Sequence, residues 1–149
     1  SSNKNIETFE SVNGELLNLG QTDISFSPEL VAANAVVFQV KEGFQISLLS
    51  KFVGEQFMGN TENSDSKLAS YFINDISITY EWKPKSVFET VVFSGLFNNI
   101  LNEEFVSNGY FGSFDFEDSS STTGTTTGYF AGFYPQATSN FLLGVTLLF

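Results

Sequence analysis

The stretch Ser139-Asn-Phe-Leu-Leu-Gly-Val-Thr-Leu-Leu-Phe149 predicts the fold class of this chain. Apolar side chains occupy every second position, at Phe141, Leu143, Val145, Leu147 and Phe149. A period of two indicates a β-strand with one apolar face. In water such an edge strand would expose backbone and apolar surface to aggregation. In a membrane barrel one face meets lipid and the next strand covers the edge, so we expect a strand of an outer-membrane barrel.

Four other segments have strand patterns, and helical periodicity is weak throughout. The clearest runs from Asp75 to Lys83, where even positions are apolar or aromatic and odd positions are polar or charged. The sequence therefore predicts an all-β protein with about five antiparallel strands, at residues 30–40, 44–52, 75–83, 88–105 and 139–149. The side chains expected to face a wet lumen or a plug are Gln45, Ser47, Lys51, Glu55, Asp75, Ser77, Thr79, Glu81 and Lys83.

Composition excludes several functions. The formal net charge of −11 repels phosphate backbones, so nucleic acid is not an expected partner. The chain has no Cys and no His, which excludes disulfides, thiol chemistry, His-dependent triads and zinc sites built on these residues. The sequence has no run of about 18 apolar residues, so a transmembrane helix is excluded. We find no nucleophile elbow, phosphate loop or distinctive carboxylate pair, and we expect neither an enzyme nor a cofactor.

The predicted connections alternate in length. Residues 41–43 and 84–86 are short turns with Gly or Pro, whereas residues 59–69 and 107–138 are long polar loops. Outer-membrane barrels have short periplasmic turns and long external loops. On this assignment residues 1–29 form an external loop and strand lead-in, and residues 30–149 form the barrel strands with their loops.

Strand parity predicts that this barrel extends beyond the chain. Complete single-chain bacterial barrels have an even number of strands with both ends in the periplasm, and five strands cannot satisfy this. We therefore expect the last strands of a larger barrel. A complete small barrel is an alternative that the odd count disfavours, although a further strand within residues 5–27 would weaken that objection.

Several segments resemble the C-terminal barrel of TonB-dependent outer-membrane receptors. They occur in order as Tyr71-Phe-Ile-Asn-Asp-Ile76, Tyr80-Glu-Trp-Lys-Pro84, Leu96-Phe-Asn-Asn-Ile-Leu-Asn-Glu-Glu-Phe105, Ser107-Asn-Gly-Tyr110, Tyr134-Pro-Gln-Ala137 and the final strand. The resemblance covers most of residues 24–149. It implies a plugged barrel of about 22 strands that imports an iron chelate, cobalamin, an oligosaccharide or a peptide across the outer membrane of a Gram-negative bacterium.

The resemblance also implies partners. They are outer-membrane lipid, the remainder of the barrel and its plug, the barrel-assembly machinery and, through the plug, an inner-membrane energy-coupling protein. Nothing in this sequence resembles the plug or its energy-coupling box. A surface lipoprotein on the external loops is left open.

Three groups of residues are candidate sites. The assembly signal read by the barrel-assembly machinery would be Leu143, Val145, Leu147 and Phe149. The aromatic girdle at the membrane interface would be Phe44, Tyr80, Trp82 and Phe88. The external contacts with a ligand or partner would be Tyr110, Phe111, Phe114, Asp115 and Phe116.

Two simpler interpretations stand beside these. The acidic and amide groups Asn98, Asn99, Asn102, Glu103, Glu104, Asp115, Glu117 and Asp118 lack the spacing of a calcium loop, so we expect solvated loops rather than a metal site. The alternative from another class is a secreted soluble β-sandwich that binds carbohydrate or mediates adhesion, in which the aromatic side chains would be core.

Overall fold

The computed structural model describes residues 3–84 and 87–149, and in these residues the chain is all-β with antiparallel pairing. Its strands are β1 (Lys4–Val12), β2 (Glu15–Asp23), β3 (Val31–Lys41), β4 (Phe44–Val53), β5 (Gln56–Phe57), β6 (Lys67–Leu68), β7 (Tyr71–Trp82), β8 (Thr90–Asn98), β9 (Val106–Glu117), β10 (Thr125–Pro135) and β11 (Asn140–Leu148), with one 3-10 turn, η1 (Ser64–Ser66). The expected count of five strands is therefore wrong, since the described residues contain eleven.

The chain divides into two compact units. We call residues Val31–Phe52, Tyr71–Glu104 and Ala137–Phe149 the sheet unit. We call residues Ser1–Leu30, Val53–Ser70 and Phe105–Gln136 the hairpin unit. The five strands expected from periodicity all fall in the sheet unit. The additional six lie in the hairpin unit, in segments that lack a clean period of two or that resemble loops in composition.

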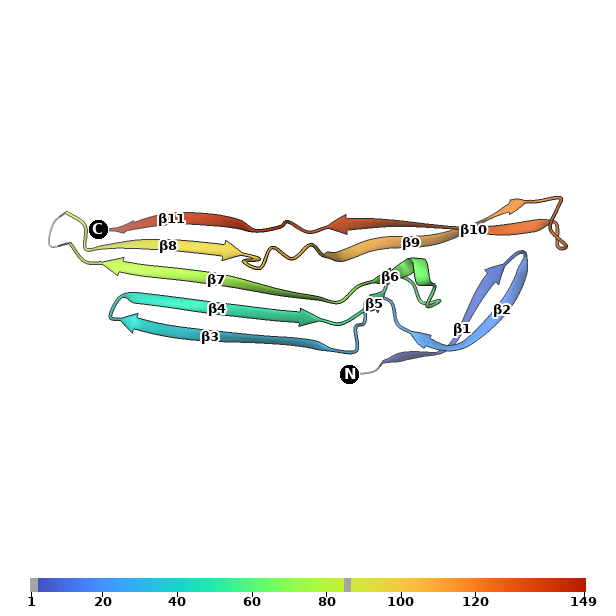
Figure 1. Ribbon diagram of the computed structural model, residues 1–149, viewed down its shortest axis with the longest axis horizontal. Helices are drawn as coiled ribbons and strands as arrows, with labels where there is room; N and C mark the ends of the chain where they lie inside the picture. The colour runs from blue at the N-terminus through green and yellow to red at the C-terminus, as the bar shows by residue number, and fades with distance from the viewer. Residues whose placement is uncertain (1–2, 85–86) are drawn as a thin grey trace. The chain divides into compact units, whose positions relative to one another are not determined.

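The sheet unit is one five-stranded sheet in the order β11-β8-β7-β4-β3. Figure 1 shows that neighbouring arrows in this sheet point in opposite directions, as in an antiparallel meander. Gly43 closes the β3–β4 turn with a φ of 74°, and a Cβ there would lie 2.9 Å from the Glu81 carbonyl oxygen. The turn therefore requires glycine, as the sequence predicts. The second predicted turn, at residues 84–86, extends outside the described residues.

The strand predicted at residues 88–105 is shorter in the structure, where β8 ends at Asn98. Asn99 and Asn102 have φ values of 49° and 55°, and this left-handed conformation cannot continue a strand. The amide of Asn99 donates to Glu103 O and its Oδ1 accepts from Glu103 N, at 2.8 and 2.9 Å. Ser139 donates to Asn99 O at 2.6 Å. Asn99 thus ties the segment after β8 to the segment before β11.

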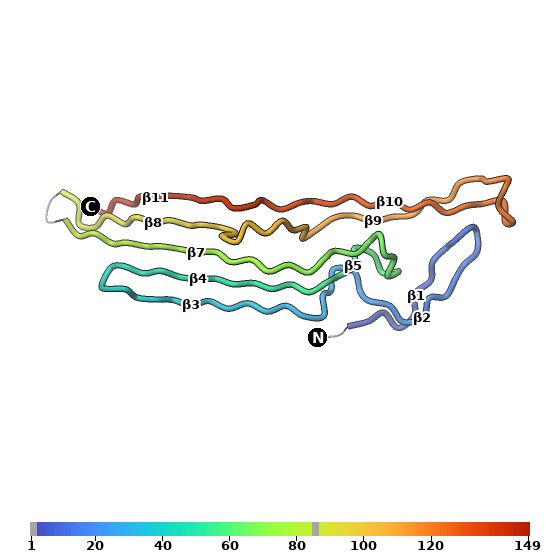
Figure 2. The backbone as a smooth tube through the Cα atoms, in the orientation of Figure 1, coloured from blue at the N-terminus to red at the C-terminus, as the bar shows by residue number. Residues whose placement is uncertain are grey.

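The hairpin unit contains two long hairpins and one short strand pair. β1 pairs with β2, β9 with β10, and β5 with β6. The β1–β2 turn is Asn13-Gly14, with φ values of 53° and 78°. Two positive φ values are the signature of the type I′ turn that Asn-Gly favours, so this dipeptide is the sequence signal for the first hairpin. Figure 2 shows the chain turning back between β1 and β2.

Within the loop expected at residues 107–138, the Ser-, Thr- and Gly-rich residues 119–128 form the tip of the second hairpin and the start of β10. β9 and β10 pair from Val106↔Pro135 to Glu117↔Thr125, so most of this expected loop is sheet. The Asp118 side chain organises the tip because it accepts hydrogen bonds from Ser120 N at 2.9 Å and Thr126 Oγ1 at 2.8 Å. Ser and Thr residues that look structureless in sequence therefore have defined roles in a turn.

The buried core of the described residues is small. Its apolar members are Val53, Met58, Leu68, Tyr71 and Val91. Many larger apolar side chains are exposed instead, including Phe38 at 64% and Phe141 at 67%. In the described residues no helix has the length and hydropathy needed to cross a membrane.

Candidate functional site

The sheet unit has one continuous apolar face across β7, β8 and β11. Residues paired across antiparallel strands point to the same side, so the register defines this face. Its rows are Ile76–Phe97–Phe141, Ile78–Gly95–Leu143, Tyr80–Phe93–Val145 and Trp82–Val91–Leu147. We call these four rows the apolar face. They contain every apolar position that the period of two predicts for strands 75–83 and 139–149 except Phe149.

The apolar face is largely uncovered. Leu143 is 66% exposed and Val145 is 61% exposed, whereas Val91 on β8 is buried. Leaving one such side chain in water rather than burying it costs about 1.5–3 kcal/mol. A face of this size would therefore drive association with an apolar phase or a partner. The three predicted assembly residues Leu143, Val145 and Leu147 all lie on it.

Phe149 is the fourth predicted assembly residue and lies just beyond β11. It is 82% exposed, and its ring contacts Phe88 at a centroid distance of 5.0 Å. Phe88 is a predicted member of the aromatic girdle. The structure thus brings together one residue from each of two predicted groups, at the end of the sheet where β8 begins.

The other three girdle candidates lie at the same end of the sheet, Phe44 at the start of β4 and Tyr80 and Trp82 at the end of β7. The ring of Tyr80 meets Phe44 edge-on at 6.0 Å and stacks on Phe93 at 6.3 Å. Trp82 is 50% exposed one row further along. The Nζ of Lys41 lies 5.5 Å from the Tyr80 ring centroid, a cation–π contact that sequence reasoning missed. Aromatic rings beside a lysine are typical of the interface between lipid and water.

Polar groups bound the apolar face at its opposite end. Beyond the row of Ile76, Ser50 donates a hydrogen bond from Oγ to Asn74 Oδ1 at 2.5 Å, and both side chains are buried. Asn74 has the same parity on β7 as Ile76, so it points to the same side. Asp75 accepts a hydrogen bond from Asn99 N at 2.8 Å. Aromatic side chains therefore lie at one end of the apolar face, and hydrogen-bonded polar side chains lie at the other end.

The opposite face of the sheet is mixed. Its rows are Ser77–Leu96–Leu142, Thr79–Ser94–Gly144 and Glu81–Val92–Thr146. The predicted lumen residues Gln45, Thr79 and Glu81 line one shallow pocket. Glu55 lies beyond the end of β4 at Val53 and pairs with Lys67 at 2.6 Å in the hairpin unit, apart from the other expected lumen residues. On β11 this face presents Leu142, which is 68% exposed, beside Gly144 and Thr146.

The predicted external contacts all lie on β9, but the strand divides them between its two faces. Tyr110, Phe114 and Phe116 share one face and are 45–52% exposed. Phe111 and Asp115 lie on the other face. Phe111 stacks on Tyr129 at 5.8 Å, and Asp115 accepts from Thr127 Oγ1 at 2.6 Å. The five residues thus do not form one contact surface.

The exposed face of the β9–β10 hairpin is an aromatic ladder. We define it as Tyr134, Tyr110, Phe130, Phe114 and Phe116, whose successive centroids are 6.1, 6.3, 6.4 and 6.0 Å apart. Three rings lie over the glycine that faces them, in the pairs Tyr110/Gly132, Phe130/Gly112 and Phe114/Gly128. One side of each of these rings rests on backbone and the other side is open. Sequence reasoning missed Phe130 and Tyr134, although both follow the same period of two.

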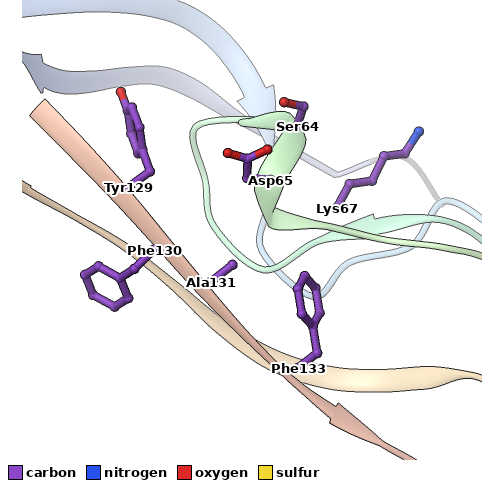
Figure 3. A pocket seen from close by; sticks show the side chains of 7 residues that line it. All are labelled: Ser64, Asp65, Lys67, Tyr129, Phe130, Ala131 and Phe133. Carbon is purple, nitrogen blue, oxygen red and sulfur yellow. The ribbon is translucent and has the colours of Figure 1, made fainter.

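A cleft of about 370 Å³ lies within the hairpin unit, between the η1–β6 segment and β10 (Figure 3). It is lined by Ser64, Asp65, Lys67, Tyr129, Phe130, Ala131 and Phe133. Burial of the phenol, followed by the charge of Glu10, a hydrogen bond to Glu10 and the charge of Asp115, raises the pKa of Tyr129. The sequence predicts none of these lining residues as part of a site, because they come from separate segments.

The acidic candidates for a metal site do not assemble in the structure. Within residues 3–84 and 87–149 no three carboxylate side chains come together in a way that could hold a metal ion. Asn99, Asn102 and Asp118 instead make hydrogen bonds to nearby backbone and hydroxyl groups.

Comparisons with known proteins do not place this chain in a family. No protein-family model, curated protein or solved structure matches it.

Proposed function

We propose that this chain is part of the barrel wall of a TonB-dependent outer-membrane receptor that imports a scarce nutrient, such as an iron chelate, cobalamin, an oligosaccharide or a peptide. The observation that carries the proposal is the apolar face of the sheet unit, which is continuous over three strands and exposed along the whole of β11. Lipid is the occupant that a flat apolar sheet face of this kind fits.

The dimensions of the apolar face agree with a bilayer. From Phe141 on the apolar face to Phe149, which lies just beyond it, the chain advances about 27 Å at roughly 3.4 Å per residue. At the strand tilt of roughly 35–45° found in such barrels this is about 20 Å of height, close to the apolar band of about 25 Å. The rings of Phe44, Tyr80 and Trp82 lie at one limit of the face, where an interfacial girdle is expected.

The edges of the sheet unit also support a place within a larger barrel. Among the described residues β3 and β11 each have a single neighbouring strand. An exposed edge in lipid would leave backbone N–H and C=O groups without partners, each at a cost of several kcal/mol. Further strands on both sides would satisfy these groups. The choice of this receptor class among membrane barrels comes from the ordered sequence segments that resemble TonB-dependent receptors.

The alternative of a soluble β-sandwich receives less support. A sandwich buries one face of each sheet against another sheet at about 10 Å. Phe141, Leu143 and Val145 would then be core residues, whereas each is more than 60% exposed.

Site-directed labelling tests the proposal. Because the chain has no Cys, Val145→Cys and Thr146→Cys each create a single labelling position on opposite faces of β11. With the full receptor in lipid vesicles, a fluorophore at position 145 should be quenched by lipid-borne nitroxides and not by aqueous iodide. A fluorophore at position 146 should show the opposite preference.

The labels at positions 145 and 146 serve as controls for each other, because the two residues are adjacent on opposite faces of β11. Equal quenching by iodide at both positions, together with a chain that stays monomeric without detergent, would overturn the membrane proposal. For the transport step, uptake of the imported nutrient should stop when the proton gradient across the inner membrane is collapsed. Uptake that continues unchanged would contradict the receptor class.

A further inference from the structure

The cleft in the hairpin unit combines aromatic walls with a negative charge. Tyr129 and Phe133 extend from one side of β10 toward the η1–β6 segment, while Phe130 points to the other side of the strand (Figure 3). Asp65 projects from η1 on the facing wall. A volume of about 370 Å³ lies in the range of roughly 300–1,000 Å³ that small-molecule sites occupy.

The charges around the cleft favour a cation. In the described part of the chain the Asp65 carboxylate has no hydrogen-bond donor or ion-pair partner from another side chain. Lys67, the one basic residue in the lining, is already paired with Glu55 at 2.6 Å. The lining itself carries one positive and one negative charge, and Glu55, which lies outside the lining, pairs with the positive one, so the three charges together sum to −1.

A second acidic influence comes from β1 and β9. The charges of Glu10 and Asp115 both act on the Tyr129 phenol and help to raise its pKa. These two carboxylates therefore add negative charge near the Tyr129 phenol besides that of Asp65. Thr127 and Ser11 donate to Asp115 at 2.6 and 3.5 Å, but neither carries a charge that would cancel it.

We propose that this cleft binds a small organic cation, with an alkylammonium or guanidinium group on the Asp65 carboxylate and its carbon chain between the rings of Tyr129 and Phe133. A carboxylate and an aromatic face are the two groups that recognise such cations together. The cation is either a free amine or the side chain of a Lys or Arg in a peptide. The inference does not rest on the proposed membrane function, because every residue involved lies in the hairpin unit.

Binding is tested on the full chain, solubilised as the native protein requires, with n-butylammonium as the probe and n-butanol as its uncharged isostere. Saturation-transfer NMR should detect the ammonium with a dissociation constant on the order of millimolar, as expected for so few heavy atoms. N-butanol should bind at least about tenfold more weakly. Equal binding of the two probes would overturn the proposal, since the carboxylate would then contribute nothing.

Three variants locate the site. Asp65→Asn keeps the shape of the side chain and should weaken n-butylammonium binding by about tenfold, and Phe133→Ala should weaken it several-fold. Glu104→Gln removes the same charge outside the lining and should leave binding unchanged. Circular dichroism establishes that each variant keeps its strands. If Asp65→Asn binds like the parent protein, or if Glu104→Gln loses as much affinity as Asp65→Asn, the assignment fails.

A second comparison of probes distinguishes a free amine from the side chain of a peptide as the source of the cation. A Gly-Lys-Gly peptide with blocked ends is compared with free n-butylammonium. Tighter binding of the peptide that still depends on Asp65 identifies a peptide side chain as the ligand. Tighter binding of the free amine identifies a small amine.

Discussion

The ring of Tyr110 lies over Gly132, in the space that a Cβ on this glycine would fill. Phe130 over Gly112 and Phe114 over Gly128 repeat this arrangement along the same hairpin, with the ring alternating between β9 and β10. Glycine in a strand normally weakens the strand because it has no side chain to pack. Here the facing ring supplies the missing contact, so each ring and its glycine act as one packing unit.

Substitution of Gly132 by Ala should destabilise the β9–β10 hairpin by about 1–3 kcal/mol, because the new methyl group displaces the Tyr110 ring. Hydrogen exchange of the β9 and β10 amides measures the loss. The double variant Tyr110→Gly with Gly132→Tyr exchanges the ring and the glycine across the pair. It should recover part of the protection, and no recovery would mean that the ring and glycine do not act together.

Removal of the Asn99 side chain should destabilise the sheet unit. Asn99 is 4% exposed, holds a φ of 49° and exchanges two hydrogen bonds with Glu103. Asn99→Ala loses these bonds and also disfavours the left-handed backbone, for a total of about 2–4 kcal/mol. Asn99→Gly keeps the backbone freedom and should lose less. Unfolding in denaturant compares the two, and a glycine variant that is less stable than the alanine variant would refute this account.

The hydrogen bond between Ser50 and Asn74 should show strong coupling in a double-mutant cycle. Ser50→Ala leaves the buried Asn74 Oδ1 without its donor, at a cost of about 1–3 kcal/mol. Once Asn74 has been replaced by Leu, the Ser50→Ala substitution should cost much less, since no acceptor remains. Additive free energies of unfolding would show that the two side chains are independent.

The tip of the second hairpin should lose order in acid. Hydrogen bonds from the Ser120 side chain, the Ser120 backbone and Thr126 lower the pKa of Asp118 below 3.8. A lowered folded-state pKa contributes stability that is present above the unfolded value of 3.8 and is lost as the pH falls through the lower folded value. Carbon-13 NMR of the carboxyl group measures the pKa. Thr126→Val should raise it toward 3.8, whereas an unchanged pKa would contradict the role of the Thr126 hydroxyl.

Local alternation is sufficient to locate the strands of the sheet unit. The strand predicted at residues 44–52 is observed as β4 (Phe44–Val53), and the one at residues 139–149 as β11 (Asn140–Leu148). The strand predicted at residues 88–105 is too long because Asn99 and Asn102 leave the β conformation. Hydropathy does not reveal this change, whereas two asparagines three positions apart offer a hint.

The sequence leaves open one further strand within residues 5–27, where the structure has β1 and β2. The rest of the hairpin unit is not predicted, because its signals are weak or resemble those of loops. Its first turn is Asn13-Gly14, a strong hairpin signal, but the flanking residues alternate too weakly to indicate strands on their own. In the second hairpin, glycines interrupt the aromatic pattern of β9 and β10 and resemble loop residues. They become interpretable only when each one is paired with the ring across from it.

By itself the sequence determined that the chain is all-β, where the five strands of the sheet unit lie, and which of their residues share an apolar face. These are local properties, since a period of two assigns alternate side chains to opposite faces whatever the strand pairs with. Only the tertiary structure decided that Tyr110 packs on Gly132 and that Asp65 and Tyr129 line the same cleft. Such contacts join residues far apart in the chain, and their pairing depends on the register and packing of the whole unit.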